Sequence, residues 1–530
     1  MVVEFISELR TARRHCFCTP LLGREIPPPS PRKKTPKKTK EEDEGRRVSL
    51  EVLEEDAALQ RSDVHAARSI GLPNRRPQTR SIQSVSSTGV GPITVSESFV
   101  SRDGLTRGSR SLNGETLSIA SRPDVNGDFT QTTVNPDSTQ SRTTYQHGLM
   151  LTAATLKTDS SVITSTSYTY DSLQRPLTVT DARTGTTSYD LDSNGQADVT
   201  ESGQPLAIKT PANHITSLSY DIMGRQISST LPDNSVNYTA YYLTGQVKAS
   251  WGSQTYPTWN VYDEQGRQTQ LHTWKIAPAL TLASIPATPP AGSDMTTWVY
   301  GPTTGLLDRK QYADGNGTNY SYTSAGRLGS RTWARGVVTI YGYTHGMMTS
   351  TNYSDSTPDV LMTYEALGRP RSVSNGLAKS EFSYDPATLA VDKETISYDL
   401  DGTAGYEFTR VIDRKQDALL RDVGFDLKNG TTLENQAIYG YSPTDGRLAS
   451  ISGGGFQAPS PAFSYAYLPN SNLLQTITAT AGAVHTVHNS WEPNRDVLAA
   501  KQNKVGTTVI SQYDYSVNAI GQRTGVSQAG

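Results

Sequence analysis

The stretch YSYTSAGRL at residues 320–328 sets the pattern for most of this 530-residue chain. Related stretches follow it, YGYTHGMM at 341–348 and TYEALGRP at 363–370. The key aromatic falls at Tyr300, Tyr322, Tyr343, Tyr364 and Tyr384, with gaps of 22, 21, 21 and 20 residues. A fixed period of this size indicates an array of small units, each of which buries its apolar face only by stacking on its neighbours.

Each unit reads as a strand, a turn and a second strand. Tyr320 and Tyr322 are two residues apart, so they share one face of a strand. A polar stretch then ends in Gly-Arg, where glycine can adopt the positive φ of a tight hairpin. Copies of this dipeptide begin at Gly224, Gly266, Gly326, Gly368 and Gly446. The pattern predicts an all-β fold, a repetitive antiparallel β-hairpin array with about a dozen units over roughly 360 residues and under about a tenth helix.

The Tyr-x-Tyr-Asp sequence followed by Gly-Arg resembles the YD repeat of the Rhs family over residues 160–530. The same repeats occur in wall-associated bacterial proteins, in the B and C subunits of insecticidal toxin complexes and in teneurins. The resemblance implies a long β-sheet ribbon wound into a hollow shell whose lumen can hold another polypeptide. Periodicity alone allows a solenoid or a propeller equally well. Two copies depart from the motif, Tyr364-Glu365 and Trp491-Glu492-Pro493-Asn494.

Composition divides the chain into three parts. Residues 1–75 form a basic and Pro-rich tail that we expect to be disordered, because it cannot bury enough apolar surface to offset its ordering entropy. Residues 76–160 are an irregular β-rich lead-in, and residues 161–530 are the repeat region. A Pro-rich insertion at about 275–294 excludes a central strand there. It is interpreted as a loop between units, with a binding or plug segment as the alternative.

Charge and hydropathy exclude some classes of partner. The formal net charge of −2 gives no attraction to nucleic acid, and no run approaches the 18 apolar residues of a membrane span. The first 23 residues do not read as a signal peptide. A secreted or cell-surface location, in bacteria, therefore follows from the resemblance alone. We expect the sequence to be a piece of a longer Rhs-type protein.

One local motif stands apart from the repeat. Residues 190–201, DLDSNGQADVTE, match the twelve-residue calcium loop, with glycine at position six for the sharp turn. The expected oxygen ligands are Asp190, Asp192, Asn194, Asp198 and Glu201. Neither flank looks helical, and Asp and Gly are turn residues in any case. An ordinary turn therefore remains the alternative to a calcium site.

The sequence contains no catalytic signature. A Gly-x-Ser-x-Gly elbow, a phosphate-binding loop and a His-Glu-x-x-His motif are all absent, so we expect no enzyme activity. The favoured function is a structural segment of an Rhs-type shell that encases or displays a toxin polypeptide, as in polymorphic toxins. The alternative is an adhesin that binds carbohydrate on cell-surface glycans through exposed aromatics. Its candidates are Trp251, Trp259, Trp274, Trp298, Trp333 and Trp491.

Overall fold

A computed structural model describes residues 50–52, 77–87, 90–101, 103–121, 123–399, 405–455, 458–459, 462–479 and 483–530. The chain divides into two compact units, Met1–Arg47 and Val48–Gly530, and all described residues lie in the second. The expected disordered tail therefore falls outside the described residues, except for Leu50–Val52. Those three residues form strand β1, which pairs with β2.

The described part of the chain consists of 39 strands in one antiparallel sheet and contains no helix, which confirms the predicted fold class. The lead-in strands are β2 (Pro77–Ser87), β3 (Val90–Ser101), β4 (Thr106–Ser111), β5 (Gly114–Ala120), β6 (Phe129–Val134), β7 (Gln140–Gln146) and β8 (Leu149–Leu156). They belong to the same sheet as the repeats, so the sheet is continuous across residue 160.

The first half of the repeat region contains twelve strands. They are β9 (Val162–Tyr170), β10 (Pro176–Asp181), β11 (Gly185–Ser188), β12 (Ala207–Lys209), β13 (Ile215–Tyr220), β14 (Gln226–Thr230), β15 (Val236–Tyr241), β16 (Val247–Gly252), β17 (Thr258–Tyr262), β18 (Gln268–Thr273), β19 (Asp294–Tyr300) and β20 (Leu307–Gln311). The Pro-rich insertion connects β18 to β19 and forms neither strand nor helix, as its prolines predict.

The second half continues the same hairpin order. Its strands are β21 (Gly317–Tyr322), β22 (Leu328–Thr332), β23 (Val338–Thr344), β24 (Met347–Tyr353), β25 (Val360–Tyr364), β26 (Pro370–Ser374), β27 (Ala378–Tyr384), β28 (Val391–Tyr398), β29 (Phe408–Gln416), β30 (Asp422–Asn429), β31 (Thr432–Tyr441), β32 (Leu448–Gly455), β33 (Ala458–Pro459), β34 (Phe463–Tyr467), β35 (Leu474–Ala479), β36 (His485–Trp491), β37 (Leu498–Val505), β38 (Thr508–Val517) and β39 (Arg523–Ala529).

The Gly-Arg turns have the predicted conformation. Gly224 and Gly326 have φ values of 76° and 74°, in the left-handed region where a side chain is strained. The Gly224 amide donates to the Asp221 carbonyl at 2.9 Å and closes the β-turn. Each such hairpin also carries a register shift at its tyrosine, for example between Ser219 and Tyr220. A β-bulge of this kind redirects the side chain that follows it.

The redirected tyrosines connect each unit to the one before it. The Tyr322 hydroxyl donates to the Leu307 carbonyl at 2.8 Å, and the Tyr343 hydroxyl to the Leu328 carbonyl at 3.0 Å. The same bond, between 2.6 and 3.2 Å, is made by Tyr170, Tyr220, Tyr241, Tyr262, Tyr300, Tyr364, Tyr384, Tyr441 and Tyr467. Because the accepting carbonyl belongs to the preceding unit, this bond fixes the spacing between units.

The aspartate and arginine of the motif complete the link. Asp221 accepts a hydrogen bond from the Arg225 guanidinium at 2.7 Å, which aims that guanidinium at the next unit. Arg225 then lies 4.6 Å from the centre of the Tyr241 ring and donates to the Tyr242 carbonyl. A guanidinium over an aromatic ring is a favourable cation–π contact. We call the Asp–Arg pair together with the following tyrosine the inter-unit link.

The two departures from the motif preserve this link. Glu365 pairs with Arg369 at 2.7 Å, and Arg369 lies 3.9 Å from the Tyr384 ring centre. Trp491, at a tyrosine position, donates its indole N–H to the Leu474 carbonyl at 3.1 Å. The indole N–H therefore donates to the preceding unit where a phenol hydroxyl does in the other units.

The hydrophobic core is small and local. Its buried members are Ala240, Ala249, Trp251, Trp259, Trp274 and Leu280, and Tyr238, Val261 and Ile285 pack against them. Leu280 and Ile285 belong to the Pro-rich insertion, which therefore covers one face of β15–β18. The Lys248 ammonium donates to the Pro286 carbonyl at 2.7 Å, and the Trp274 indole to the Ala291 carbonyl at 3.2 Å. The insertion is thus a packed cover over the tryptophans.

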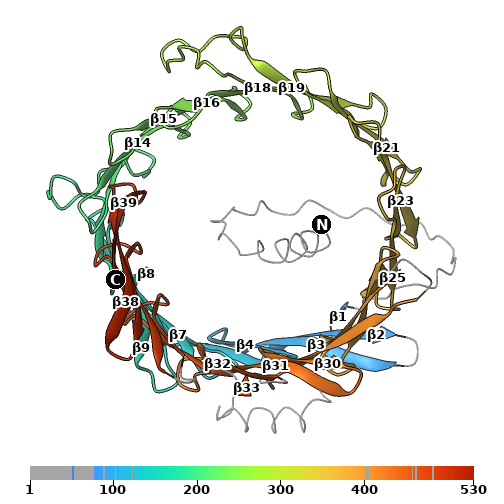
Figure 1. Cartoon of the computed structure of the whole chain (residues 1–530). Coiled ribbons are helices and arrows are strands. Elements are labelled where there is room, and N and C mark those ends of the chain that lie inside the picture. The colour runs from blue at the N-terminus through green and yellow to red at the C-terminus, as the bar shows by residue number, and fades with distance from the viewer. Residues whose placement is uncertain are drawn as a thin grey trace, which may run out of the picture. The chain divides into compact units, whose positions relative to one another are not determined.

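The ribbon of the Val48–Gly530 unit curves until its later strands meet its earlier ones (Figure 1). The Thr158 amide, between β8 and β9, donates to the Thr444 carbonyl, between β31 and β32, at 2.8 Å. Arg183 donates to the Glu492 carbonyl, 309 residues away, at 3.0 Å and pairs with Asp496. Asn494 donates to the Pro211 carbonyl at 3.3 Å. We call these contacts between hairpin turns the seam.

Removing one tyrosine hydroxyl tests the hydrogen bond that joins each unit to the one before it. Tyr322→Phe should lower the free energy of unfolding by about 1 kcal/mol, because the Leu307 carbonyl loses its donor while the ring remains. Tyr256→Phe is the matched control, since its side chain is exposed. Urea unfolding followed by tryptophan fluorescence measures both. Equal midpoints for the two variants would show that this hydrogen bond contributes nothing to stability.

Acid should weaken one link at a defined pH. Burial alone would raise the pKa of Asp171, but hydrogen bonds from the Arg175 guanidinium and from the Arg175 and Ala197 amides lower it to about 2. The folded pKa lies below the unfolded value, so the stabilisation is complete above about pH 4 and is lost as pH falls from about 4 to about 2. Asp171→Asn should remove this part of the pH dependence of the melting temperature, whereas Glu264→Gln, in the corresponding turn of another unit, should keep it. A wild-type slope in Asp171→Asn would refute the assignment.

Candidate functional site

The predicted calcium loop lies in the long connection between β11 and β12. The carboxylates of Asp190, Asp192 and Asp198 converge, with ligand oxygens within 4.8 Å of one another. Glu201 is not part of this group. Asn194 lies beside it, and its side-chain amide donates to Asp192 at 2.9 Å. The structure therefore brings together three of the five expected ligands as a carboxylate cluster, with an amide at its edge.

The loop is held by hydrogen bonds from its own backbone. Asp190 accepts the Gly195 amide at 2.9 Å and the Asn194 amide at 3.2 Å. Burial alone would raise the pKa of Asp190, but the hydrogen bonds from the Gly195 and Asn194 amides hold that pKa below its usual value. Asp190 therefore remains an ionised oxygen acceptor at neutral pH. Three hard oxygens are fewer than the six to eight that calcium takes, so water would have to supply the rest.

Three of the six tryptophans that were proposed to bind glycans are buried. Trp251, Trp259 and Trp274 are 7%, 0% and 4% exposed beneath the insertion. Those three cannot stack on a sugar, because the insertion occupies that face of the sheet. Trp298 and Trp491 are half-buried, and Trp333 is exposed. Sequence alone could not separate them, since tryptophan occurs in both settings.

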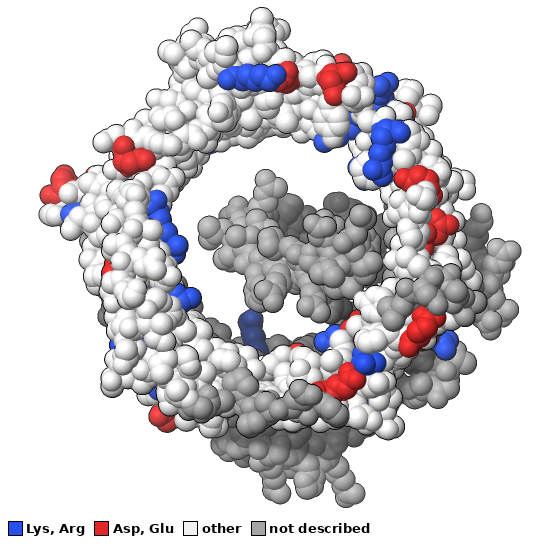
Figure 2. Space-filling view, in the orientation of Figure 1, with Lys and Arg blue, Asp and Glu red and all other residues white. Residues whose placement is uncertain are grey.

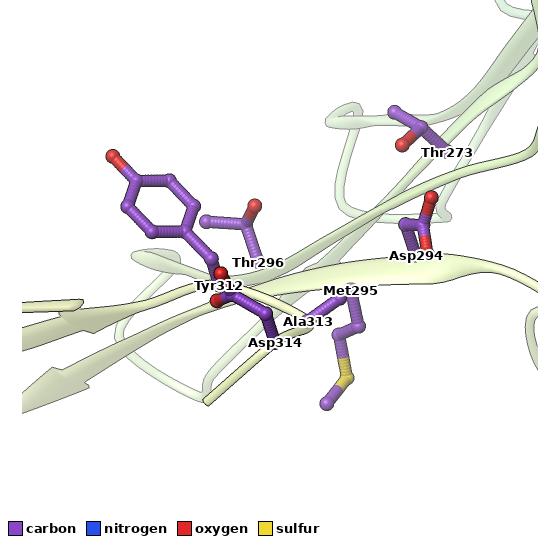
Figure 3. Close-up of a pocket in the computed structure, with 7 residues that line it drawn as sticks. All are labelled: Thr273, Asp294, Met295, Thr296, Tyr312, Ala313 and Asp314. Atoms are coloured by element: carbon purple, nitrogen blue, oxygen red, sulfur yellow. The ribbon is translucent and has the colours of Figure 1, made fainter. Parts of the chain in front are cut away.

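A pocket of about 470 Å³ opens beside the insertion (Figure 3). It is lined by Thr273 at the end of β18, by Asp294, Met295 and Thr296 at the start of β19, and by Tyr312, Ala313 and Asp314 in the turn after β20. In Figure 3, Met295 points away from the side on which Tyr312, Thr296 and Asp294 lie. No motif in the sequence marks these residues. The alternation of Asp294, Thr296 and Trp298 along β19 places them on one face, and this was the available signal.

Charges are scattered over the view in Figure 2, with no large surface of one sign among the described residues that it shows. Many charged side chains of the repeat units form ion pairs within their own turns. Such pairs are Arg175–Asp171, Arg225–Asp221, Arg267–Asp263, Arg369–Glu365, Arg421–Asp417, Arg447–Asp445 and Arg495–Glu492. The described residues also include no helix that could cross a membrane.

Comparison with known structures identifies the fold. A crystal structure of TcdB2–TccC3 without the hypervariable C-terminal region matches 84% of this chain with a TM-score of 0.51 and 13% identity. A Tc holotoxin pore of Photorhabdus luminescens matches 85% with a TM-score of 0.49 and 11% identity. This chain spans 27% and 29% of the length of those two chains. No protein-family model and no curated protein sequence matches it.

The likeness to TcdB2–TccC3 confirms, for the fold, the resemblance indicated by the tyrosine-glycine repeat. The described residues form the antiparallel ribbon of hairpins that the repeat predicted. The solenoid and propeller that periodicity alone allowed are replaced by a single sheet in which successive hairpins follow one another along a curve (Figure 1).

Calcium binding is testable with two matched loops. Titration calorimetry of the chain with calcium chloride should show a site that is lost in Asp190→Ala, because that carboxylate belongs to the cluster. Asp124→Ala, in the shorter DVNGD turn at 124–128, should leave binding unchanged. No heat in the wild type would return residues 190–201 to an ordinary turn.

Proposed function

We propose that this chain is a non-catalytic structural scaffold, a segment of a β-shell that encases or displays another polypeptide. The observation that supports this most directly is the seam. Hairpin turns of the ribbon form hydrogen bonds with turns 283 and 309 residues away. Two parts of the sheet that are distant in the sequence therefore lie side by side, as the edges of a closed shell would. A wall of this kind encloses space without needing a dense core.

The seam contains specific polar contacts. The Arg183 side chain is only 8% exposed, because it reaches across the seam to the Glu492 carbonyl and the Asp496 carboxylate. A guanidinium with several fixed acceptors is a directional contact, which sets the register between the two passes of the ribbon. Residues near 183 and near 492 therefore hold the wall together in a way that the repeat alone does not.

The scaffold proposal also accounts for the absence of catalytic motifs. In the described units, the aspartates and arginines of the motif serve the inter-unit links, and the tyrosine hydroxyls donate to backbone carbonyls. These carboxylates, guanidiniums and hydroxyls therefore stabilise the sheet. The proposed cargo is a polypeptide such as a toxin domain, and the proposed setting is secreted or cell-surface, as the YD-repeat resemblance implies.

Protection from protease tests the enclosure. An unstructured polypeptide with trypsin sites, fused after Gly530, should be cut more slowly than the same polypeptide alone, because the wall restricts access. Arg183→Ala should restore fast cutting by weakening the seam. Arg335→Ala, whose side chain is 70% exposed, is the control and should keep the protection. Equal cutting of the fused and free polypeptide would overturn the proposal.

A further inference from the structure

The antiparallel ribbon has two edges, which are formed by its turns. Successive turns lie at opposite ends of the strands that they connect, so they alternate between the two edges. We call edge A the one that contains the Gly-Arg turns, such as 221–225 and 263–267. Edge B contains the turns between them, such as 157–161 and 181–185. The two edges therefore present different sequences to solvent or to a neighbour.

The seam joins edge A of the later strands to edge B of the earlier strands. On edge A, the carbonyls of Thr444 and Glu492 accept hydrogen bonds, and the donors are Thr158 and Arg183 on edge B. In the described residues, no hydrogen bond or ion pair joins the edge A turns of residues 171–267 to a distant part of the ribbon. This stretch of edge A lies outside the seam.

The turns of edge A that lie outside the seam carry exposed apolar side chains at their tips. In the described part of the chain, Val125, Ile222 and Leu243 are the large apolar residues that are completely exposed, and all three lie in edge A turns. Met223 and Leu173, in the same row of turns, are 75% and 68% exposed. Contiguous exposed apolar surface marks a site of contact with another molecule.

These turns are fixed relative to one another. The Arg225 guanidinium donates to the Tyr242 carbonyl at 2.9 Å, and the Gln246 side-chain amide donates to the Gly266 carbonyl at 2.9 Å. Neighbouring turns on one edge are separated by two strand spacings, about 10 Å. Ile222 and Leu243 therefore form a continuous apolar row on a rigid support, whose conformation needs no change when a partner binds.

Edge B carries matching apolar side chains where it lies outside the seam. Tyr312, Trp333 and Leu377 are 45%, 37% and 49% exposed, and each begins or lies in an edge B turn between β20 and β27. The backbone of the Trp333 turn is closed by a hydrogen bond of 2.9 Å from the Gly336 amide to the Trp333 carbonyl. Each edge thus offers apolar side chains on fixed turns.

We propose that two copies of this chain associate head to tail, with the edge A turns of residues 171–246 in one copy packed on the edge B turns of residues 312–377 in the other. The seam supports this choice of partner, because within one chain edge A already binds edge B and not another edge A. The two surfaces differ, so the contact is heterologous and each added copy exposes a further edge A. This self-association goes beyond the proposed scaffold function and does not depend on it.

Sedimentation velocity of the full chain over a range of concentrations tests the association. The wild type should form oligomers whose size rises with concentration. Ile222→Thr combined with Leu243→Thr should weaken the association about tenfold or more, because the apolar row on edge A is lost. The matched control is Ile340→Thr combined with Ile438→Thr, at exposed positions within strands, and it should associate as the wild type does. Leu173→Thr combined with Met223→Thr is a second edge A variant.

Mixing two variants tests the head-to-tail arrangement. Tyr312→Thr combined with Leu377→Thr alters edge B and should also give a monomer. An equimolar mixture of this variant with the edge A variant should form a complex of two copies and no larger species. The reason is that one intact edge A and one intact edge B remain between them, which allows a single contact. Circular dichroism establishes that each variant keeps the folded sheet.

Three results would overturn the proposal. One is a wild type that sediments as a monomer at every concentration. Another is an edge B variant that associates as the wild type does, because edge A would then pair with itself. The third is a monomeric wild type that cosediments with phosphatidylcholine vesicles, which would assign the apolar turns to a membrane surface. The protease-protection experiment has a separate readout, so its failure would leave these results unaffected.

Discussion

The structure depends on the bond between a tyrosine hydroxyl and a carbonyl of the preceding unit. A hairpin of two short strands is marginal in water by itself, and these units bury little apolar surface. The link adds a directed hydrogen bond and a cation–π contact between successive units, as Tyr241 does with Gln226 and Arg225. The carboxylate matters because it aims the arginine. Arg369, paired with Glu365, lies 3.9 Å from its ring, whereas Arg327, which follows Thr323 rather than an acid, lies 5.8 Å from Tyr343.

This arrangement explains how a long sheet persists with a small core. Only eleven hydrophobic residues are buried among those described, and six of them form the one cluster beneath the insertion. Stability in such an array is close to a sum over units and the contacts between neighbours. At one place the insertion supplies the apolar packing that the repeat units lack, because it covers three tryptophans that would otherwise face water. The insertion ends at Asp294, which is one of the residues that line the pocket.

The seam adds long-range order to this local scheme. Every inter-unit link joins neighbours along the ribbon, so the links alone do not determine where the ribbon meets itself. Arg183 and Asn494 bond at the meeting point, to partners 309 and 283 residues away along the chain. These two side chains lie in turns, at positions whose residue type the repeat motif does not specify. The structure therefore rests on two classes of residue, those that join neighbouring units and those that make contacts across the seam.

The sequence by itself determined the repeating part of this protein. The spacing of Tyr300, Tyr322 and Tyr343 and the Gly-Arg turns predicted the hairpins, because strand alternation and positive φ are local properties. The calcium-loop pattern at residues 190–201 also predicted that three carboxylates come together, because the spacing of that pattern is a local property of the sequence. Only the tertiary structure showed that the insertion covers Trp259, that Arg183 reaches Glu492, and that Tyr312 borders a pocket. Each of these depends on which distant segments meet, and the curvature of the whole ribbon decides this, whereas no single unit does.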